Sequence, residues 1–127
     1  MANLGKKVLL VEDDPFLSLL LKNRLQKEGF EVILAKDGQE ALETVVKRAW
    51  KPDLILIDVI LPGKSGFEVL EEIKANAQLK GTVMVIMSNL GQEEDIKRGK
   101  ELGAHYFIKS QTPLDELMKK LKELLKI

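Results

Sequence analysis

The chain has 127 residues, and its 20 Lys and Arg balance its 20 Asp and Glu, so the formal net charge is zero. This length suits one domain that buries a core without metals or disulfides. The absence of cysteine excludes disulfide frameworks, Cys-ligated zinc, iron–sulfur clusters and thiol nucleophiles. The charge balance argues against non-specific nucleic-acid binding, which needs a basic surplus. No apolar run approaches the roughly 18 residues of a membrane span, and the start of the chain does not resemble a signal peptide, so we expect a cytoplasmic protein.

Short apolar runs recur along the chain, each bounded by charged or turn residues, and all are continuous rather than alternating. Continuous runs are typical of strands that are buried on both faces of a parallel sheet. The predicted strands are Val8–Val11, Val32–Ala35, Leu54–Ile57, Val83–Met87 and Tyr106–Ile108.

Segments with helical spacing separate these runs. One predicted helix carries its apolar residues at i, i+3, i+4 and i+7, namely Leu42, Val45, Val46 and Ala49. The last predicted helix carries Leu114, Leu117, Met118, Leu121, Leu124 and Leu125. Helix starts are indicated by Asp14-Pro15, Thr112-Pro113, Asp37 with Glu40, and Ser65 with Glu68, and helix ends by Gly29 and Gly103.

Strand and helix therefore alternate five times, which predicts a doubly wound α/β fold with right-handed crossovers. No linker or low-complexity tract interrupts the chain, so residues 1–127 are interpreted as one domain. The helix expected at Gln92–Leu102 offers only Ile96 and Leu102 as large apolar residues. We expect it to pack shallowly, and shallow elements are the ones that move.

Polar side chains follow the predicted strands, where open parallel sheets bind their ligands. Glu12 and Asp13 follow the first strand, Asp58 the third, Ser88 the fourth and Lys109 the fifth. Each alone is weak evidence of a site, since single charges at strand ends are often only solvated. Together they predict a shared rim on which several carboxylates, a hydroxyl and a lysine converge. Asp14 is most simply a helix cap.

Crowded carboxylates repel one another by about 4 kcal/mol at about 4 Å when the effective dielectric constant is about 20. A cation would relieve this repulsion, and hard oxygen ligands suit Mg²⁺. A carboxylate beside a metal, a lysine and a hydroxyl favours phosphoryl transfer, with Asp58 as the nucleophile. Lys109 and Ser88 would then bind two phosphoryl oxygens.

With these residues, the chain resembles the receiver domain of two-component response regulators, especially the single-domain chemotaxis type. The resemblance runs from about Lys6 to Leu125. It rests on five motifs in order: Val8-Leu9-Leu10-Val11-Glu12-Asp13-Asp14, Asp53-Leu54-Ile55-Leu56-Ile57-Asp58, Leu61-Pro62-Gly63-Lys64-Ser65-Gly66, Val85-Ile86-Met87-Ser88 and Tyr106-Phe107-Ile108-Lys109. It implies a flavodoxin-like, three-layer fold with a five-stranded parallel sheet in the order 2-1-3-4-5 and five helices.

The resemblance also implies the role of each site residue. Asp58 matches the phosphoacceptor, and Mg²⁺ would be held by Glu12, Asp13, Asp58 and the backbone carbonyl of Ile60. Ser88 matches the switch hydroxyl, Lys109 the family's lysine, and Tyr106 the aromatic residue whose ring swings inward. The phosphoryl group would come from a histidine kinase or a phosphotransfer protein. The fourth helix, fifth strand and fifth helix would form an output face for a downstream protein or a second copy, without nucleic acid or membrane.

Three positions depart from the family's commonest pattern. Ser110 stands where a proline usually follows the lysine, and Asn89 stands where a small residue usually follows the hydroxyl. Ile60, two residues after the acceptor, has no polar group to position an attacking water. We therefore expect slow self-dephosphorylation.

Three alternatives are less consistent with the sequence. A haloacid-dehalogenase-like phosphatase needs Asp-x-Asp after a strand, whereas the chain has Asp58-Val59-Ile60 and no cap domain. A flavodoxin-like electron carrier needs a phosphate-binding loop where Glu12-Asp13-Asp14 would repel phosphate. A receiver that has lost phosphorylation would not need the intact set of site residues. We therefore expect a signalling switch rather than an enzyme.

Overall fold

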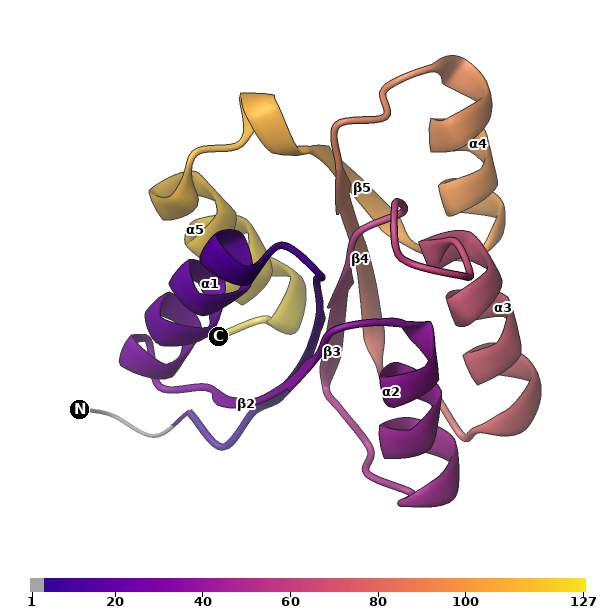
Figure 1. Ribbon diagram of the computed structural model, residues 1–127. Helices are drawn as coiled ribbons and strands as arrows, with labels where there is room; N and C mark the ends of the chain where they lie inside the picture. Colours follow the sequence, from indigo (N-terminus) through magenta and orange to yellow (C-terminus); the bar gives the residue numbers. More distant parts are fainter. Residues whose placement is uncertain (1–3) are drawn as a thin grey trace.

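The computed structural model describes residues 4–127, which form a five-stranded parallel sheet in the order β2-β1-β3-β4-β5 (Figure 1). The strands are β1 (Lys7–Val11), β2 (Glu31–Ala35), β3 (Leu54–Ile57), β4 (Val83–Ser88) and β5 (His105–Ile108). In the register of the sheet, Val8 of β1 lies between Val32 of β2 and Leu54 of β3. The predicted strands and their order are confirmed, and no strand end differs from its prediction by more than one residue.

Helices cover both faces of this sheet, as the doubly wound prediction requires. They are α1 (Pro15–Lys27), α2 (Gly38–Leu42), α3 (Gly66–Asn76), α4 (Glu93–Glu101) and α5 (Leu114–Leu125). In Figure 1, α1 and α5 lie on one side of the sheet, and α2, α3 and α4 lie on the other. Within residues 4–127, no helix is both long and apolar enough to cross a membrane.

The core consists of two apolar clusters, one on each face of the sheet. Leu9 and Val11 of β1 belong to the cluster that packs with α2 and α3, whereas Val8 and Leu10 belong to the cluster that packs with α1 and α5. Successive side chains of a strand point to opposite faces, so a strand covered on both sides needs apolar residues throughout. This explains why the strands are continuous apolar runs.

Most predicted helix starts are confirmed. The Asp14 carboxylate accepts hydrogen bonds from the amides of Phe16 and Leu17, and Ser65 forms a complete capping box with Glu68. The prediction for Thr112 was wrong. The N-cap position of α5 is Pro113, without a side-chain cap, because a 3-10 turn (η2, Lys109–Gln111) carries Thr112 back over the end of β5. There its hydroxyl donates to the Ile108 carbonyl at 2.8 Å.

The second predicted helix differs from the observed one at its end. The α-helical part stops at Leu42 and continues as a π-helical turn, η1 (Glu43–Lys47). Ala49 lies beyond it in the left-handed region, with a φ of 52°. The apolar residues at Leu42, Val45 and Val46 have the spacing of an ordinary α-helix, so the pattern gave no sign of the wider turn. The wider turn lets the Trp50 amide donate to the Thr44 carbonyl at 3.1 Å while Trp50 packs against the core.

Helix α3 begins directly against the backbone that follows β3. The Gly66 amide donates to the Val59 carbonyl at 2.8 Å. A Cβ atom at Gly66 would lie 2.2 Å from the Asp58 carbonyl oxygen, so only glycine permits this approach. The contact holds the start of α3 and the backbone of Asp58 in a fixed relation.

We predict that Gly66→Ala lowers the free energy of unfolding by about 2 to 3 kcal/mol, because the added methyl group meets rigid backbone. Urea denaturation measures this change. Gly91→Ala is the matched control, since its Cβ meets only the end of the flexible Ile108 side chain, at 3.1 Å. Equal denaturation midpoints for the two variants would contradict the prediction.

Candidate functional site

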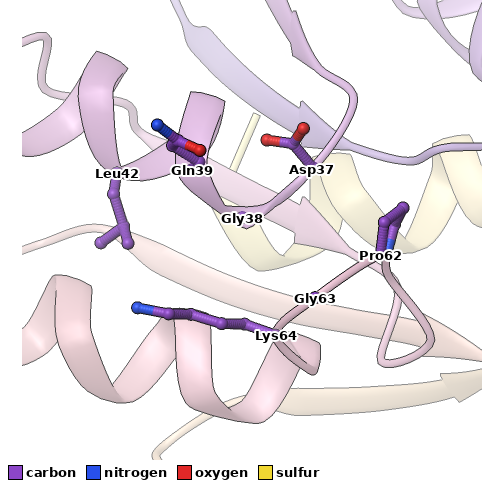
Figure 2. A pocket seen from close by; sticks show the side chains of 7 residues that line it. All are labelled: Asp37, Gly38, Gln39, Leu42, Pro62, Gly63 and Lys64. Atoms are coloured by element: carbon purple, nitrogen blue, oxygen red, sulfur yellow. The ribbon is translucent and has the colours of Figure 1, made fainter.

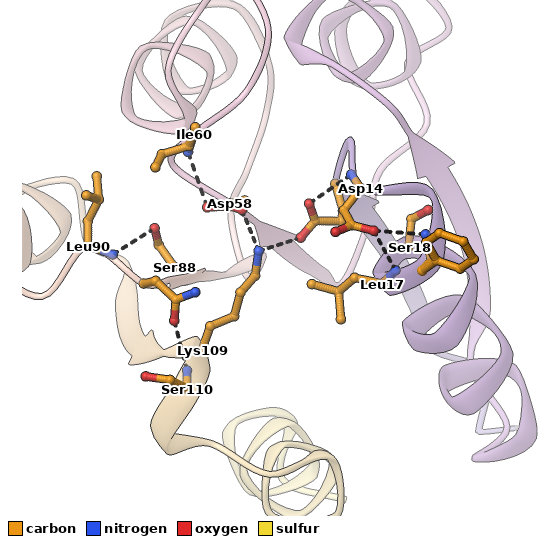
Figure 3. Close-up of polar contacts among 12 residues, drawn as sticks. Asp14, Leu17, Ser18, Asp58, Ile60, Ser88, Leu90, Lys109 and Ser110 are labelled. Carbon is orange, nitrogen blue, oxygen red and sulfur yellow. Dashed lines mark hydrogen bonds and ion pairs between the residues drawn. The ribbon is translucent and has the colours of Figure 1, made fainter.

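Three charged side chains from separate strands meet at the carboxyl edge of the sheet (Figure 3). The Lys109 ammonium lies 2.5 Å from Oδ2 of Asp58 and 2.8 Å from Oε1 of Glu12. Glu12 follows β1, Asp58 follows β3 and Lys109 follows β5, because parallel strands present their carboxyl ends at one edge. Both carboxylates are buried, with 2% of Glu12 and 8% of Asp58 exposed.

The electrostatics of this cluster follow from two acids sharing one base. Burial raises the pKa of Glu12, and this effect exceeds the lowering by its hydrogen bonds to Lys109 and the Asp14 amide. Burial alone would lower the pKa of Lys109, but the hydrogen bonds to Asp58 and Glu12 outweigh burial and raise it. The ammonium therefore stays charged, and with both acids ionised the cluster carries one excess negative charge.

Backbone amides orient both carboxylates. Oδ1 of Asp58 accepts a hydrogen bond from the Ile60 amide at 3.2 Å, which leaves Oδ2 for Lys109. In the same way, Oε2 of Glu12 accepts from the Asp14 amide at 3.2 Å while Oε1 faces Lys109. Each acid thus has one oxygen fixed by its own loop and one fixed by the shared ammonium. The Ile60 side chain itself is 61% exposed.

Ser88 and Tyr106 both contact Leu90, in the loop that follows β4. The buried Ser88 hydroxyl accepts a hydrogen bond from the Leu90 amide at 3.3 Å. The Tyr106 hydroxyl donates to the Leu90 carbonyl at 2.5 Å. Burial raises the pKa of Tyr106, so its hydroxyl remains a donor at neutral pH. The two predicted switch residues therefore hold the two backbone groups of one residue.

The Tyr106 ring packs closely against helix α4 at a position where the helix has a glycine. A Cβ atom at Gly99 would lie 2.9 Å from Cδ2 of Tyr106 and 3.2 Å from Cδ1 of Ile86. Gly99 is also the one buried residue of α4, which confirms that this helix packs shallowly. Sequence reasoning missed both Gly99 and Leu90. Gly99 matters because it lacks a side chain, and Leu90 takes part only through its backbone groups. Neither property appears as a sequence motif.

Asp13 is not part of the contacts around Lys109, and its side chain is exposed. Within residues 4–127, no three His, Asp or Glu side chains are arranged to hold a metal ion. The reason is the alternation of an extended chain, which turns Glu12 inward and its neighbour outward. The donor chemistry still fits a hard divalent cation, because the buried acids supply oxygen ligands and an excess negative charge that Lys109 does not cancel.

A cavity of about 10 Å³ lies beneath the cluster, lined by Glu12, Asp58 and Lys109 together with apolar residues, and has room for about one water. Another cavity, of about 330 Å³, lies between the start of α2 and the loop before α3 (Figure 2). Its charged walls are Asp37 and Lys64. The Lys64 ammonium already pairs with Glu72, so this cavity has no uncompensated cation for an anionic ligand.

The profile of the response regulator receiver domain matches residues 8–122, nearly the whole chain. The chain belongs to this family.

Among known proteins, this receiver domain is 36% identical to the transcriptional regulatory protein CpxR of Escherichia coli over 120 residues, which are 94% of this chain and 49% of CpxR. The chain thus spans about half the length of that relative. It is 32% identical to the sporulation initiation phosphotransferase F of Bacillus subtilis, with 96% of this chain and 95% of that protein covered.

Solved structures agree with this assignment. The chemotaxis protein CheY4 of Vibrio cholerae superposes with a TM-score of 0.85 at 30% identity, covering 94% of this receiver domain and 98% of that chain. The BeF3-activated N-terminal receiver domain of RstA from Klebsiella pneumoniae gives a TM-score of 0.81 at 30% identity, covering 95% and 99%. The flavodoxin-like, CheY-type fold predicted from the sequence is therefore confirmed.

We predict that Lys109→Met lowers the free energy of unfolding by about 3 kcal/mol at pH 8, because it leaves two buried carboxylates without their cation. The loss shrinks as the pH falls through the raised pKa of Glu12, since a protonated acid needs no cation. Urea denaturation at several pH values measures both effects. Adding Glu12→Gln removes one of the orphaned charges and restores part of the stability. A loss that does not change with pH would refute this account.

Proposed function

We propose that this receiver domain is a phosphorylation switch of a two-component phosphorelay, in which Asp58 accepts a phosphoryl group. The observation that carries the proposal is the 2.5 Å contact between Lys109 and a buried Asp58 carboxylate. An Asp58 oxygen attacks phosphorus, a P–O bond forms, and the P–N bond of a phosphohistidine breaks, leaving its electron pair on the histidine nitrogen. The chain catalyses at most its own phosphorylation and slow dephosphorylation.

The residues around Asp58 support this chemistry. The pKa of Lys109 is raised, so its ammonium is charged and stabilises the negative charge on the oxygens of a phosphoryl group on Asp58. The Ser88 hydroxyl, once released from the Leu90 amide, donates to another of these oxygens. We assign Mg²⁺ to the carboxylates of Glu12, Asp13 and Asp58 and the carbonyl of Ile60, with waters completing the shell. When bound, the ion neutralises charge on the phosphoryl oxygens.

A histidine kinase or phosphotransfer protein must cover the rim to bring its histidine to Asp58. Helix α1 supports such docking, because its Phe16, Leu19 and Leu20 side chains are 87%, 57% and 54% exposed. A groove of about 310 Å³ continues from this helix to Lys109 and Leu114. An exposed apolar patch beside a reacting group favours contact with a protein partner. We place this exchange in the cytoplasm.

We further propose that α4, β5 and α5 form the output face, where a downstream protein or a second copy binds. Tyr106 of β5 supports this, because its hydroxyl contacts the loop after β4 while its ring contacts Gly99 of α4. Movement of Ser88 toward a phosphoryl group would displace Leu90, which would change the position of the Tyr106 ring. A shallow α4 responds to such a change at little cost.

The first test is phosphorylation by a small donor. Incubation with acetyl phosphate and Mg²⁺ should add one phosphoryl group to the wild-type chain, detected by intact mass, and omission of the ion should prevent it. Asp58→Asn is the matched control, since it keeps the size of the side chain and removes the nucleophile. A wild-type chain left unmodified at millimolar donor would contradict the proposal.

The second test concerns the lifetime of the phosphoryl group. We predict slow hydrolysis, because the exposed Ile60 side chain has no polar group to position an attacking water. Ile60→Asn supplies such a group and should speed hydrolysis about tenfold. Ile60→Val keeps an apolar side chain and should match the wild type. The measurement follows loss of the phosphoryl group by mass after the donor is removed, and complete loss within seconds in the wild type would refute the prediction.

A further inference from the structure

Two of the three residues that depart from the family's usual pattern, Asn89 and Ser110, are hydrogen-bonded to each other. The Ser110 amide donates a hydrogen bond to Oδ1 of Asn89 at 2.9 Å (Figure 3). A proline at position 110 would have no N–H to donate, and an alanine or glycine at position 89 would have no side-chain oxygen to accept. The bond therefore depends on both departures at once.

This bond joins the loop after β4 to the turn after β5, which both lie on one side of Asp58 in the order of the sheet. Ser88 and Ile108 are partners in the register of β4 and β5, and Asn89 and Lys109 follow them directly. Asn89 is thus adjacent to the predicted switch hydroxyl, and Ser110 is adjacent to the lysine that contacts Asp58. A backbone displacement that separates the loop after β4 from the turn after β5 therefore stretches this bond.

We propose that the Asn89–Ser110 hydrogen bond is a latch that holds the loop after β4 in its resting position and opposes switching. The inference rests on the proposed function, in which Ser88 releases the Leu90 amide and turns toward the phosphoryl group. Asn89 is a positioning residue in this scheme. It acts on Ser88 through the backbone and does not contact the reacting atoms.

The surroundings of the latch indicate how strongly it acts. Within the described residues, the loop after β4 has two side-chain bonds to the β5 side, one from Ser110 to Asn89 and one from Tyr106 to Leu90. When Ser88 releases the Leu90 amide, these two bonds still hold the loop, so displacement of the loop must stretch or break them. Asn89 and Ser110 are exposed, so water can replace their bond when it opens. The latch therefore biases the switch by a modest factor and does not block it.

Beryllofluoride with Mg²⁺, a mimic of the phosphoryl group, provides the test. Asn89→Leu keeps the size of the side chain and removes the acceptor, so its apparent affinity for the mimic should rise about threefold to tenfold. Asn89→Ala should show a similar rise. Ser110→Ala keeps the backbone N–H and should match the wild type. Titrations followed by NMR measure all four proteins.

A second measurement tests the Asn89–Ser110 hydrogen bond without a phosphoryl mimic. Hydrogen exchange of the Ser110 amide in the free protein should be about threefold to tenfold faster in Asn89→Leu than in the wild type, because its acceptor is gone. If the leucine variant binds the mimic as the wild type does and only the alanine variant binds more tightly, Asn89 acts by size alone and the latch is refuted. Unchanged exchange also refutes it. If the wild type does not bind the mimic while exchange responds as expected, the bond exists and the proposed function fails.

Discussion

One partly buried ammonium group holds together acids that would otherwise repel each other. Lys109 lies between Glu12 and Asp58, which follow different strands and are both removed from water. Breaking a buried ion pair by removing one partner is far more costly than losing a surface pair. The strand ends that carry these residues must therefore stay in register, and the geometry of the rim depends on this contact.

The fold supplies that register through its backbone. The order β2-β1-β3-β4-β5 sets β3 between β1 and β4, so residues distant in sequence reach one edge of the sheet. Gly66 then holds the start of α3 against the Asp58 carbonyl. Two apolar clusters, one on each face, fix the sheet between its helices. The polar residues at this edge of the sheet are few, and the strand order, the contact at Gly66 and both apolar clusters together position them.

The strands and the meeting of Glu12, Asp58 and Lys109 could be predicted because continuous apolar runs end in polar residues. Other features left no such signal. The π-helical turn after Leu42 has the same apolar spacing as an α-helix, and Thr112 has the residue type of a cap but turns back to Ile108. The exposure of Asp13 follows from chain alternation after β1, which a motif of adjacent acids does not reveal.

Gly99 has a consequence for helix α4 as a whole. A glycine within a helix forfeits about 1 kcal/mol of helical stability relative to alanine. Because Gly99 has no side chain, the Tyr106 ring can pack directly against the backbone of this helix. The helix that Tyr106 contacts is therefore one whose own backbone is weakened at the point of contact, and whose only buried residue is that glycine.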